Sequence, residues 1–368
     1  MTTQLTVHSH SHSYPVVIGA GLRRNAGGWL RDLGVSKDAV VMVVTDTTVV
    51  SNGYLEPVLA SCRAEGFAVH AHSIFPGDAS KSLQTTEELY NVLLDAGLRR
   101  NGIIIALGGG VVGDLTGFVA STFLRGIPFV QMPTTLLAHD SSIGGKVGVN
   151  LERGKNLVGA FYPPLAVLYD TETLQTLPEA QWRAGMAEVI KHGIIGDPSL
   201  FERLEALPYA SIPSASEVES LLSSAINVKR AVIEQDEQEK NLRMVLNIGH
   251  TVGHAIEQYS NYGLTHGEAV SIGLTIESRI AVNRGMLSTE NFTRIRQTLM
   301  NHGLAVQAPN YPFDALAAIL NFDKKHSSSG SWTFVLPEDI GKVTIVQDVA
   351  YGEVERSYME MLKQEASE

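Results

Sequence analysis

The sequence predicts two domains: an α/β N-terminal domain of the Rossmann-like type with a parallel sheet, and a mostly α-helical C-terminal domain. Short apolar runs typical of buried strands alternate with helical patterns through residues 14–170. From residue 173 to about residue 320 the apolar residues follow a helical period nearly throughout. A length of 368 residues fits two domains of ordinary size. We therefore expect one domain over residues 1–172 and a second over residues 173–368.

The expected elements follow one another in an order typical of a parallel sheet covered on both faces. Strands are expected at residues 14–18, 40–45, 67–74, 103–107 and 129–132, and helices at residues 22–34, 52–65, 82–98 and 115–124. In the second domain we expect a helix over residues 269–282 and short strands at residues 332–336 and 342–346.

His8, His10 and His12 alternate with serines near the N-terminus. Alternate residues of a strand share one face, so we expect all three on the solvated face of an edge strand. A metal site is the weaker interpretation, because no further ligand at a fixed spacing joins them.

A glycine-rich turn follows the expected strand at residues 103–107. Gly108, Gly110 and Gly113 match the pattern G-x-G-x-x-G, in which the backbone approaches a pyrophosphate at a helix N-terminus. The acidic residue expected about 20 positions later to bind a ribose is missing. Asp46 and Asp78, which lie in earlier loops, are the candidates for that role. The turn predicts a dinucleotide site whose adenosine half lies toward these loops.

Two histidine motifs and one glutamate stand in the helical half. His250 and His254 are four residues apart on one helix face, and His266 begins the next helix. Histidines and a carboxylate from separate helices suit zinc or another borderline divalent ion. The pattern resembles the metalloprotease HExxH motif, but Thr251 replaces its glutamate, which argues against peptide hydrolysis. Spacing alone does not choose the ligands among Glu188, His250, His254, His266 and Glu268.

Basic residues are spread along a chain that is acidic overall, with a net charge of −11. This charge and the lack of a basic stripe argue against a nucleic-acid partner. Locally basic groups would instead hold phosphate and carboxylate groups of an anionic small molecule. The candidates are Arg125, Lys146, Lys155, Lys191, Lys229, Arg243, Lys324 and Lys325.

Several features favour a cytoplasmic protein. Cys62 is the only cysteine, which fits a reducing compartment. No apolar run approaches the ~18–20 residues of a membrane span, so no membrane partner is expected. Residues 1–13 are polar and lack the apolar core of a signal peptide.

Nucleotide, metal and cations together imply a reaction class. A nicotinamide would take a hydride from a secondary alcohol, while a metal lowers the pKa of the hydroxyl group and polarises the resulting ketone. The basic residues indicate that the substrate is anionic.

The chain resembles the 3-dehydroquinate synthase family over nearly its whole length. The motifs that carry the resemblance are GGGVVGDLTGF (108–118), PTTLLAHDSSIGGK (133–146), GKNLVGAFYPP (154–164), AEVIKHG (187–193), LNIGHTVGHAIE (246–257), HGEAV (266–270) and DKK (323–325). One departure is that TTLLAHD has one residue fewer before its aspartate than other members carry. The resemblance implies NAD, a divalent metal (zinc or cobalt), a phosphorylated keto-sugar acid as substrate, and a homodimer.

The resemblance also implies roles for individual residues. The metal ligands would be Glu188, His250 and His266, which leaves His254 for the substrate. NAD would contact Asp46, Asp78, Lys81, Gly109, Gly110, Val111, Val112, Gly113, Asp114, Thr134, Thr135, Lys146, Lys155, Thr173, Leu174, Gln175 and Thr176. Substrate contacts would come from Asp140, Lys146, Asn156, Lys191, Lys229, Arg243, Asn247, His254, one of Lys324 and Lys325, and Arg125 reaching across a dimer interface.

Three alternatives stay open at this point. A metal-dependent polyol dehydrogenase of the glycerol dehydrogenase type would release NADH and would not need Lys229, Arg243, Asn247 and the DKK segment. A sibling sugar-phosphate cyclase would act on a substrate without a carboxylate, which the cation Arg243 disfavours. A non-enzymatic NAD-sensing module would have little reason to keep the histidines and Glu188 together.

Overall fold

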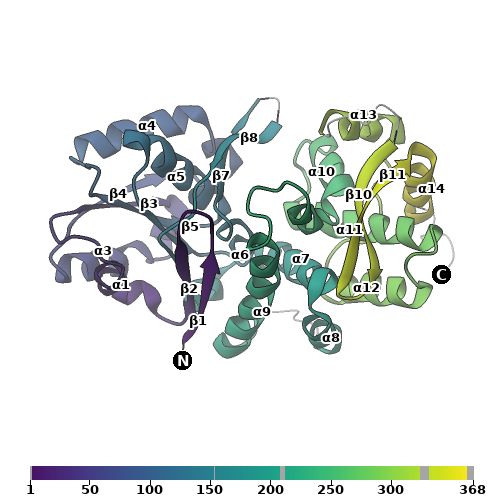
Figure 1. The fold of residues 1–368 in the computed structure, drawn as a ribbon, viewed down its shortest axis with the longest axis horizontal. Helices are drawn as coiled ribbons and strands as arrows, with labels where there is room; N and C mark the ends of the chain where they lie inside the picture. Colours follow the sequence, from purple (N-terminus) through teal and green to yellow (C-terminus); the bar gives the residue numbers. More distant parts are fainter. Residues whose placement is uncertain (1, 153, 208–211, 324–330, 363–368) are drawn as a thin grey trace. The chain divides into compact units, whose positions relative to one another are not determined.

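The computed structural model describes residues 2–152, 154–207, 212–323 and 331–362 (Figure 1). The chain forms two compact units, one made of Met1–Pro178 with Pro213–Ile226 and the other of Glu179–Ile212 with Asn227–Glu368. The first boundary between the two units follows Pro178, whereas the sequence analysis places the domain boundary near residue 172.

The first unit contains a seven-stranded sheet in the order β1-β2-β9-β6-β5-β3-β4. All neighbouring strands are parallel except β1 and β2, which form an antiparallel pair at one edge. The strands are β1 (Thr2–His8), β2 (Ser13–Gly19), β3 (Val40–Asp46), β4 (Ala68–Ile74), β5 (Ile103–Gly108), β6 (Phe129–Pro133) and β9 (Ala166–Asp170). The expected parallel sheet is therefore confirmed.

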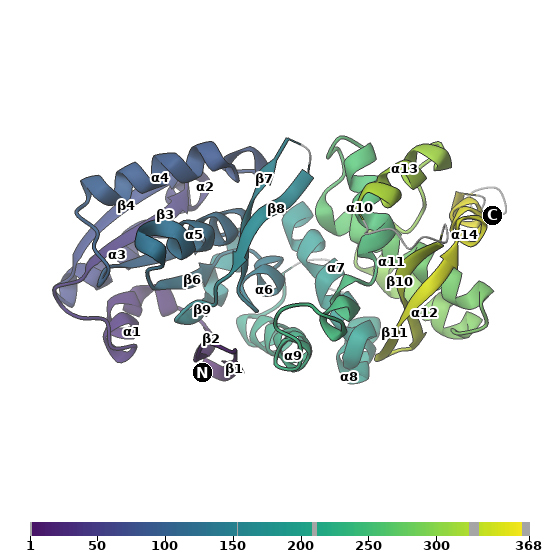
Figure 2. The same ribbon diagram turned by 45° about the horizontal axis from the view of Figure 1, so that its top comes forward.

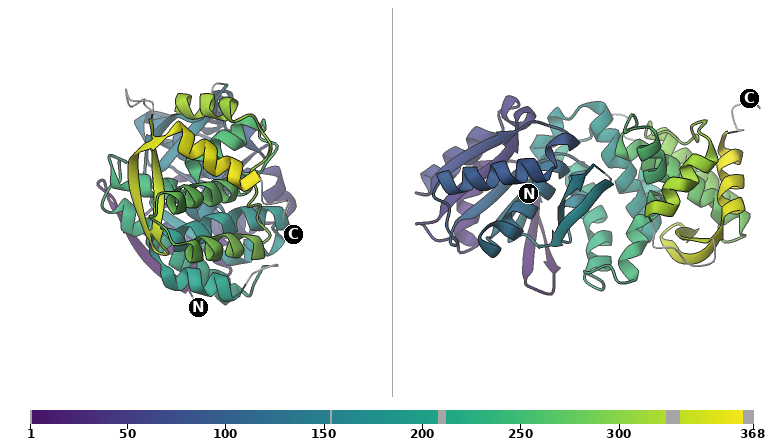
Figure 3. Two further views of the ribbon diagram at one scale, coloured as in Figure 1. Left: turned by 90° about the vertical axis from the view of Figure 1, so that its right-hand side faces the viewer. Right: turned by 90° about the horizontal axis from the view of Figure 1, so that it is seen from above.

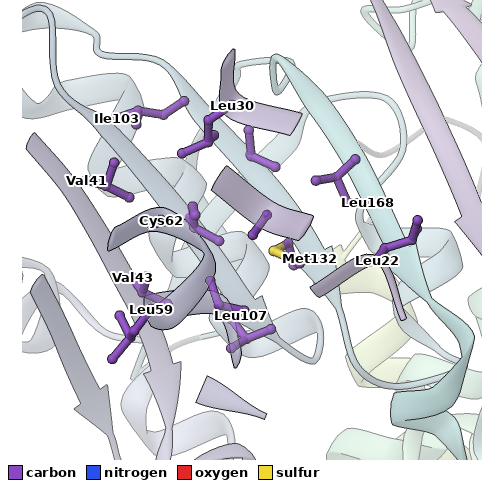
Figure 4. Close-up of a cluster of buried hydrophobic side chains, with 14 of the residues drawn as sticks. Leu22, Leu30, Val41, Val43, Leu59, Cys62, Ile103, Leu107, Met132 and Leu168 are labelled. Atoms are coloured by element: carbon purple, nitrogen blue, oxygen red, sulfur yellow. The ribbon is translucent and has the colours of Figure 1, made fainter. Parts of the chain in front are cut away.

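The central strands of the sheet are buried on both faces, and most of their residues are apolar; Thr45 on β3 and Gln131 on β6 are buried polar exceptions. Val41 and Val43 face one side with Ile103 and Leu107, packed against Cys62 and its neighbours in the cluster of Figure 4. The alternate residues face the other side and pack against helices α4 and α5; they include Met42, Val44, Ile104 and Ala106. Continuous apolar runs are what a strand buried on both faces requires.

Helices flank this sheet and a small hairpin stands beside it (Figure 2). The helical segments are η1 (Leu22–Asn25), α1 (Ala26–Asp32), α2 (Thr47–Ser51), α3 (Leu55–Ala64), η2 (Asp78–Ser80), α4 (Leu83–Asp95), α5 (Gly110–Thr122), η3 (Phe123–Arg125), α6 (Ala138–Ser141) and η4 (Thr171–Thr176). The hairpin consists of β7 (Lys146–Leu151) and β8 (Gly154–Phe161).

The expected histidine face at the N-terminus is wrong. His8 ends β1, and the chain turns back before β2 starts at Ser13, so His10 and His12 lie in the turn. Within that turn the Ser9 hydroxyl donates to the His12 carbonyl at 2.7 Å, which is a local alternative to a continued strand.

Two other expected elements differ from those observed. The helix expected at residues 115–124 is α5, and it begins at Gly110, inside the glycine-rich turn. The helix expected at residues 22–34 is divided into η1 and α1.

The second unit is mainly helical, as expected, with one antiparallel hairpin (Figure 3). Its elements are α7 (Glu179–Gly196), α8 (Pro198–Ala206), η5 (Leu242–Asn247), α10 (His250–Tyr259), α11 (His266–Asn283), α12 (Thr289–Asn301), α13 (Phe313–Asp323), β10 (Ser331–Asp339), β11 (Lys342–Ala350) and α14 (Tyr351–Leu362). Helix α9 (Ala215–Ile233) starts in the first unit and ends in the second. Both strands of the hairpin are longer than the sequence predicts. Among the described residues, no helix has the length and apolar content needed to cross a bilayer.

Candidate active site

The order of the central strands directs ligand binding to one place in the first unit. Strand β3 lies between β4 and β5, so the connections that leave β3 and β5 run to opposite sides of the sheet. In open α/β sheets, ligands bind beyond the carboxyl ends of strands at such a switch point. Asp46 ends β3 and Gly108 ends β5, which brings the glycine turn and the candidate acid to this edge.

The glycine turn has the geometry expected of a pyrophosphate site. Gly109 is the N-cap of α5 and offers no side-chain cap, so the N–H groups of the first turn face an anion position. A Cβ on Gly108 would lie 2.6 Å from the Val112 side chain, and one on Gly113 would lie 2.7 Å from Gln131 Oε1 on β6. The tight turn after β5 thus requires a glycine at position 108, and the close packing of α5 against β6 requires one at position 113. Gly109, Gly110, Val111, Val112, Gly113 and Asp114 all belong to this turn.

A network of charged side chains joins the loop after β4 to α5 and the β7–β8 hairpin. Lys81 is buried, and its Nζ lies 2.6 Å from Asp114 Oδ2 and also donates to Asn156 Oδ1. Lys155 Nζ lies 2.5 Å from Asp78 Oδ2. Five of the residues expected to bind NAD or substrate are therefore held in two sets of contacts, Lys81 with Asp114 and Asn156, and Lys155 with Asp78.

Asp46 already has a structural partner. Its Oδ1 accepts hydrogen bonds from the N–H groups of Thr48 (2.8 Å) and Val49 (2.9 Å), which caps α2. A ribose hydroxyl would therefore have to use the other carboxylate oxygen.

The turn η4, which carries Thr173, Leu174, Gln175 and Thr176, is held by a buried ion pair. Asp170 accepts hydrogen bonds from Arg23 Nη1 (2.7 Å) and from the N–H of Gly21 (2.8 Å). The Tyr54 hydroxyl shares a hydrogen bond with the Thr176 hydroxyl at 2.7 Å. These contacts fix the backbone that the family resemblance assigns to NAD.

The remaining expected residues of the first unit differ in exposure. Thr134 is buried and Thr135 and Asp140 are half-buried, whereas Lys146 is exposed at the start of β7. Arg125 is exposed and holds a left-handed backbone with φ 70°, a conformation that costs an L residue about 1 kcal/mol.

Glu188, His250 and His266 come together in the second unit from α7, α10 and α11. Their candidate ligand atoms all lie within 4.8 Å of one another. Glu188 Oε1 is 3.3 Å from His250 Nε2 and 3.2 Å from His266 Nε2. The other oxygen, Oε2, lies 2.5 Å from the Nζ of the buried Lys191. Two imidazoles and a carboxylate around one point form the donor set of a catalytic zinc site with an open position.

In His250 and His266, the ring nitrogen that faces away from Glu188 has a hydrogen-bond acceptor. His250 Nδ1 donates to the Ile248 carbonyl at 3.1 Å, and His266 Nδ1 lies 3.2 Å from Glu257 Oε2. A carbonyl or carboxylate on Nδ1 places the lone pair on Nε2, the nitrogen that faces Glu188. The residues present therefore fit a divalent metal.

The electrostatics favour a cation at the same point. Burial opposes ionisation of Glu188, yet Lys191 and His250 hold its pKa well below the usual range. Burial also opposes protonation of His266, but hydrogen bonds to Glu188 and Glu257 outweigh it and raise its pKa to about 9. Burial and Lys191 lower the pKa of His250. A divalent ion would take the position that the proton on His266 otherwise fills.

The structure separates the five ligand candidates that spacing left open. Glu268 is used as a cap: its Oε2 accepts from the Thr265 N–H at 2.8 Å and the Thr265 hydroxyl at 2.7 Å. His254 is exposed, and its ring lies 5.1 Å from that of His250, measured between ring centres. It also forms a second possible group with Glu257 and His266, so the two possible groups share His266.

The anion-binding candidates of the second unit lie on α9 and around η5. Lys229 and Arg243 are buried, and Asn247 is half-buried. Asp236 organises the loop before Arg243 by accepting from the N–H groups of Lys240, Asn241 and Arg243, which lower its pKa to about 2. Lys324 and Lys325 lie outside the described residues.

Sequence reasoning missed three acidic residues that contact the candidate site residues or the helix that carries them. Glu239 accepts from Asn247 Nδ2 at 3.2 Å and holds a left-handed backbone with φ 57°, a strain typical of functional loops. Glu257 orients His266 and Glu277 contacts the start of α10. Glu257 follows His250 by seven residues on one helix face, a spacing that could have indicated it. Nothing in the sequence points to Glu277.

Comparison with known proteins shows the family of the chain. Residues 71–184 match the family model for the 3-dehydroquinate synthase N-terminal domain, and residues 185–326 match the model for its C-terminal domain. The 3-dehydroquinate synthase of Synechococcus sp. (strain CC9605) is 45% identical over 99% of this chain and 100% of its own length.

Two solved structures share the fold. The 2-epi-5-epi-valiolone synthase of Streptomyces hygroscopicus, solved with NAD+ and Zn2+, is 30% identical with a TM-score of 0.87, covering 97% of this chain and 99% of that one. A 2-deoxy-scyllo-inosose synthase, complexed with carbaglucose-6-phosphate, NAD+ and Co2+, is 26% identical with a TM-score of 0.87, covering 98% and 100%.

Fold and site together define an enzyme of the dehydroquinate synthase-like class. Within that class the comparisons indicate one family, because the chain matches both domain models of 3-dehydroquinate synthase and is more than 40% identical to curated members. The chain belongs to the 3-dehydroquinate synthase family.

Proposed function

We propose that this chain converts 3-deoxy-D-arabino-heptulosonate 7-phosphate to 3-dehydroquinate and inorganic phosphate, a carbon–oxygen lyase reaction of the shikimate pathway. The observation that carries the proposal is the convergence of Glu188 Oε1 with the Nε2 atoms of His250 and His266 in a member of this family. Bound NAD and a divalent metal, zinc or cobalt, supply reversible hydride transfer and a Lewis acid for the alcohol.

Transient oxidation explains why a lyase would need a redox cofactor. A C–H bond next to an alcohol is far too weak an acid to lose its proton before phosphate leaves. Once the neighbouring C5 hydroxyl is a ketone, the C6 proton becomes acidic and phosphate leaves by β-elimination. Reduction of the ketone, ring opening and aldol closure then give the product, and the nucleotide returns to its starting state. The phosphate dianion of the substrate is itself a plausible base for the C6 proton.

The chain's own residues would hold the substrate at both charged ends. Arg243, with its planar guanidinium, suits the carboxylate, with Lys229 and Asn247 beside it. Lys146, Asn156 and the segment of Lys324 and Lys325 would hold the phosphate. Asp140 and Lys191 would contact ring hydroxyls.

His254 would relay the proton of the C5 hydroxyl. It stands one turn from His250, and burial of part of its ring and the nearby rings of His250 and His266 lower its pKa, which keeps the imidazole neutral and able to accept a proton.

The nucleotide would lie at the β3/β5 switch point. The first turn of α5 would bind its pyrophosphate, and Asp46, Asp78, Lys81, Lys155, Thr134, Thr135 and the turn at residues 173–176 would surround the rest. The fit rests on the uncapped N–H groups of that turn and on glycines that admit no Cβ.

We also propose a cytoplasmic homodimer, in which Arg125 reaches the site of the partner subunit. The support is the family resemblance, the single cysteine and the strained, exposed backbone at Arg125. Light scattering of the purified chain tests the dimer, and a monomer that is fully active would contradict it.

A coupled assay tests the reaction. Purified protein, NAD and Zn2+ or Co2+ are mixed with the heptulosonate phosphate, and phosphate release is followed together with absorbance at the NADH wavelength. We expect stoichiometric phosphate without accumulating NADH. Steady NADH formation on glycerol or its phosphate would instead establish a polyol dehydrogenase, and turnover of only a carboxylate-free sugar phosphate would establish a sibling cyclase.

A further inference from the structure

Helix α10 carries His250 and His254 but begins without a capping side chain of its own. Its N-cap is Gly249, which holds a left-handed backbone with φ 80°. Helix N-termini leave N–H groups without intrahelical partners, and a buried helix end needs acceptors for them. The cap of α10 must therefore come from elsewhere in the chain.

Glu277, on the neighbouring helix α11, supplies it. Its Oε2 accepts from the N–H of Gly249 at 2.5 Å, and its Oε1 accepts from the N–H of Val252 at 3.1 Å. These are the N-cap and N3 positions, the two N–H groups that a capping box satisfies with two separate side chains. One fully buried carboxylate does both tasks from a different helix. Its negative charge is also favourable at the positive end of the α10 dipole.

Close packing explains why the cap is not local. A Cβ on Gly249 would lie 2.6 Å from Leu274 Cγ on α11, and one on Gly273 would lie 1.9 Å from the Gly249 carbonyl oxygen. No serine, threonine or aspartate fits at position 249. The backbones of the two helices touch there, and the acceptor is displaced to Glu277, one turn beyond Gly273.

The same face of α11 carries the metal-ligand candidate. His266, Val270, Gly273 and Glu277 are spaced by four, three and four residues, which places them on one helical stripe. Glu277 stands three turns, about 16 Å of helix rise, from His266. It is not among the candidate metal ligands, yet its bonds to Gly249 and Val252 join the start of α10 to the helix that carries His266.

We propose that Glu277 is a positioning residue for the metal centre, which it serves by fixing the first turn of α10 against α11. His250 is the first residue of α10, so its place relative to His266 and Glu188 depends on this cap. The inference rests on the metal site of the proposed function. It predicts that loss of the cap weakens metal binding more than it weakens folding.

The variant Glu277→Gln tests this, because it keeps size and shape but turns one acceptor into a donor toward an N–H group. We expect Zn2+ binding, measured by competition with a chromogenic chelator, to weaken by about tenfold or more. The visible spectrum of the Co2+-loaded variant is expected to change, since that spectrum reports ligand geometry. Dissociation of NAD, whose proposed contacts are all in the first unit, is expected to stay unchanged.

Glu360→Gln is the matched control. Glu360 also binds α11, through Arg279 Nε at 2.5 Å and Asn283 Nδ2 at 3.1 Å, but it does not touch α10 in these contacts. We expect it to lower the melting temperature without changing Zn2+ affinity or the Co2+ spectrum. If Glu277→Gln does not yield folded protein, Glu277→Asp, which keeps the charge but is one methylene shorter, is measured against the same two criteria.

The outcomes separate this inference from the proposed function. If wild-type protein binds Zn2+ and the Glu277 variant binds it equally tightly with an unchanged Co2+ spectrum, Glu277 only stabilises the fold and the inference is wrong. If both variants weaken metal binding equally, the effect is one of general stability, which also overturns it. If wild-type protein binds no Zn2+, or if His250→Ala binds Zn2+ as tightly as wild type, the proposed function and the inference both fail.

Discussion

His250 and His254 stand one turn apart on α10, and the structure gives them different tasks. His250 Nε2 lies 3.3 Å from Glu188 Oε1, whereas His254 is an exposed residue that does not belong to the group of Glu188, His250 and His266. We expect His250→Ala to lose metal and activity together. His254→Ala should keep the metal but slow turnover by about 100-fold, the usual loss when a positioned acid–base group is removed. Metal content by atomic absorption and kcat are measured on both variants, and equal metal loss would contradict the ligand assignment.

Glu360 should make stability depend on pH in the acid range. Partial burial opposes its ionisation, but Arg279, Asn283 and Arg356 outweigh this and lower its pKa to about 2 from the usual 4.5. A depressed carboxylate pKa stabilises the fold above the unfolded value, and this contribution is lost as the pH falls through the folded value. At pH 7, Glu360→Gln should lower the free energy of unfolding by about 1–2 kcal/mol.

The difference between wild type and Glu360→Gln is expected to shrink as the pH falls below about 4.5 toward 2. Urea unfolding at pH 7, 5 and 4 measures it. The exposed Glu87 on α4 provides the control variant Glu87→Gln, whose difference from wild type should stay near zero throughout. A Glu360 difference that grows on acidification would show that the sign is wrong.

At the scale of a helix, Glu268 shows how a ligand candidate can be a cap. It forms a capping box with Thr265 at the start of α11, directly next to His266. We expect Glu268→Gln to keep full metal content, because a glutamine oxygen can still accept from the Thr265 N–H. Thr265→Ala removes the reciprocal bond and should cost about 1 kcal/mol of stability. Thermal unfolding and metal analysis check both variants, and metal loss in Glu268→Gln would return it to the ligand set.

Elements with one dominant pattern were predictable from the sequence, and those built on glycine were not. The apolar run at residues 103–107 predicts β5 because a strand buried on both faces excludes polar residues. The β7–β8 hairpin was missed because Gly148 and Gly159 interrupt its alternation; a Cβ on Gly148 would lie 2.7 Å from the Val158 carbonyl oxygen. The sequence analysis starts α5 five residues late, because the first turn of this helix, residues 110–113, consists of glycine and valine and carries no helical period.

The sequence predicts the kind of metal site but not which residues form it. The residue types and their helical spacing indicate a divalent site. Which atoms converge, however, depends on how α7, α10 and α11 pack, and on acceptors such as Glu257 and the Ile248 carbonyl that select Nε2. Sequence spacing describes one helix at a time. It therefore cannot distinguish Glu268 and His254 from the three ligand candidates that the structure brings together.

At the scale of the whole molecule, the two kinds of ligand contact belong to different units. The residues proposed for NAD all lie within Met1–Pro178, and the metal-ligand candidates all lie within the unit that contains Glu179–Ile212 and Asn227–Glu368. A ligand that binds only the native state at 100 times its dissociation constant stabilises the fold by about 2.7 kcal/mol. Each ligand should therefore protect its own unit first.

Hydrogen exchange measures this directly. NAD alone should slow exchange of the amides in the first turn of α5, where no N-cap side chain accepts from the N–H groups that would bind the pyrophosphate. It should also slow exchange in η4, which would contact the rest of the nucleotide. Zn2+ alone should slow exchange in the first turns of α10 and α11 by up to about 100-fold, the equivalent of 2.7 kcal/mol. His250→Ala, which removes a ligand, serves as the control and should lose only the Zn2+ effect. If Zn2+ slowed exchange in α5 but not in α10, the assignment of the metal to the second unit would be wrong.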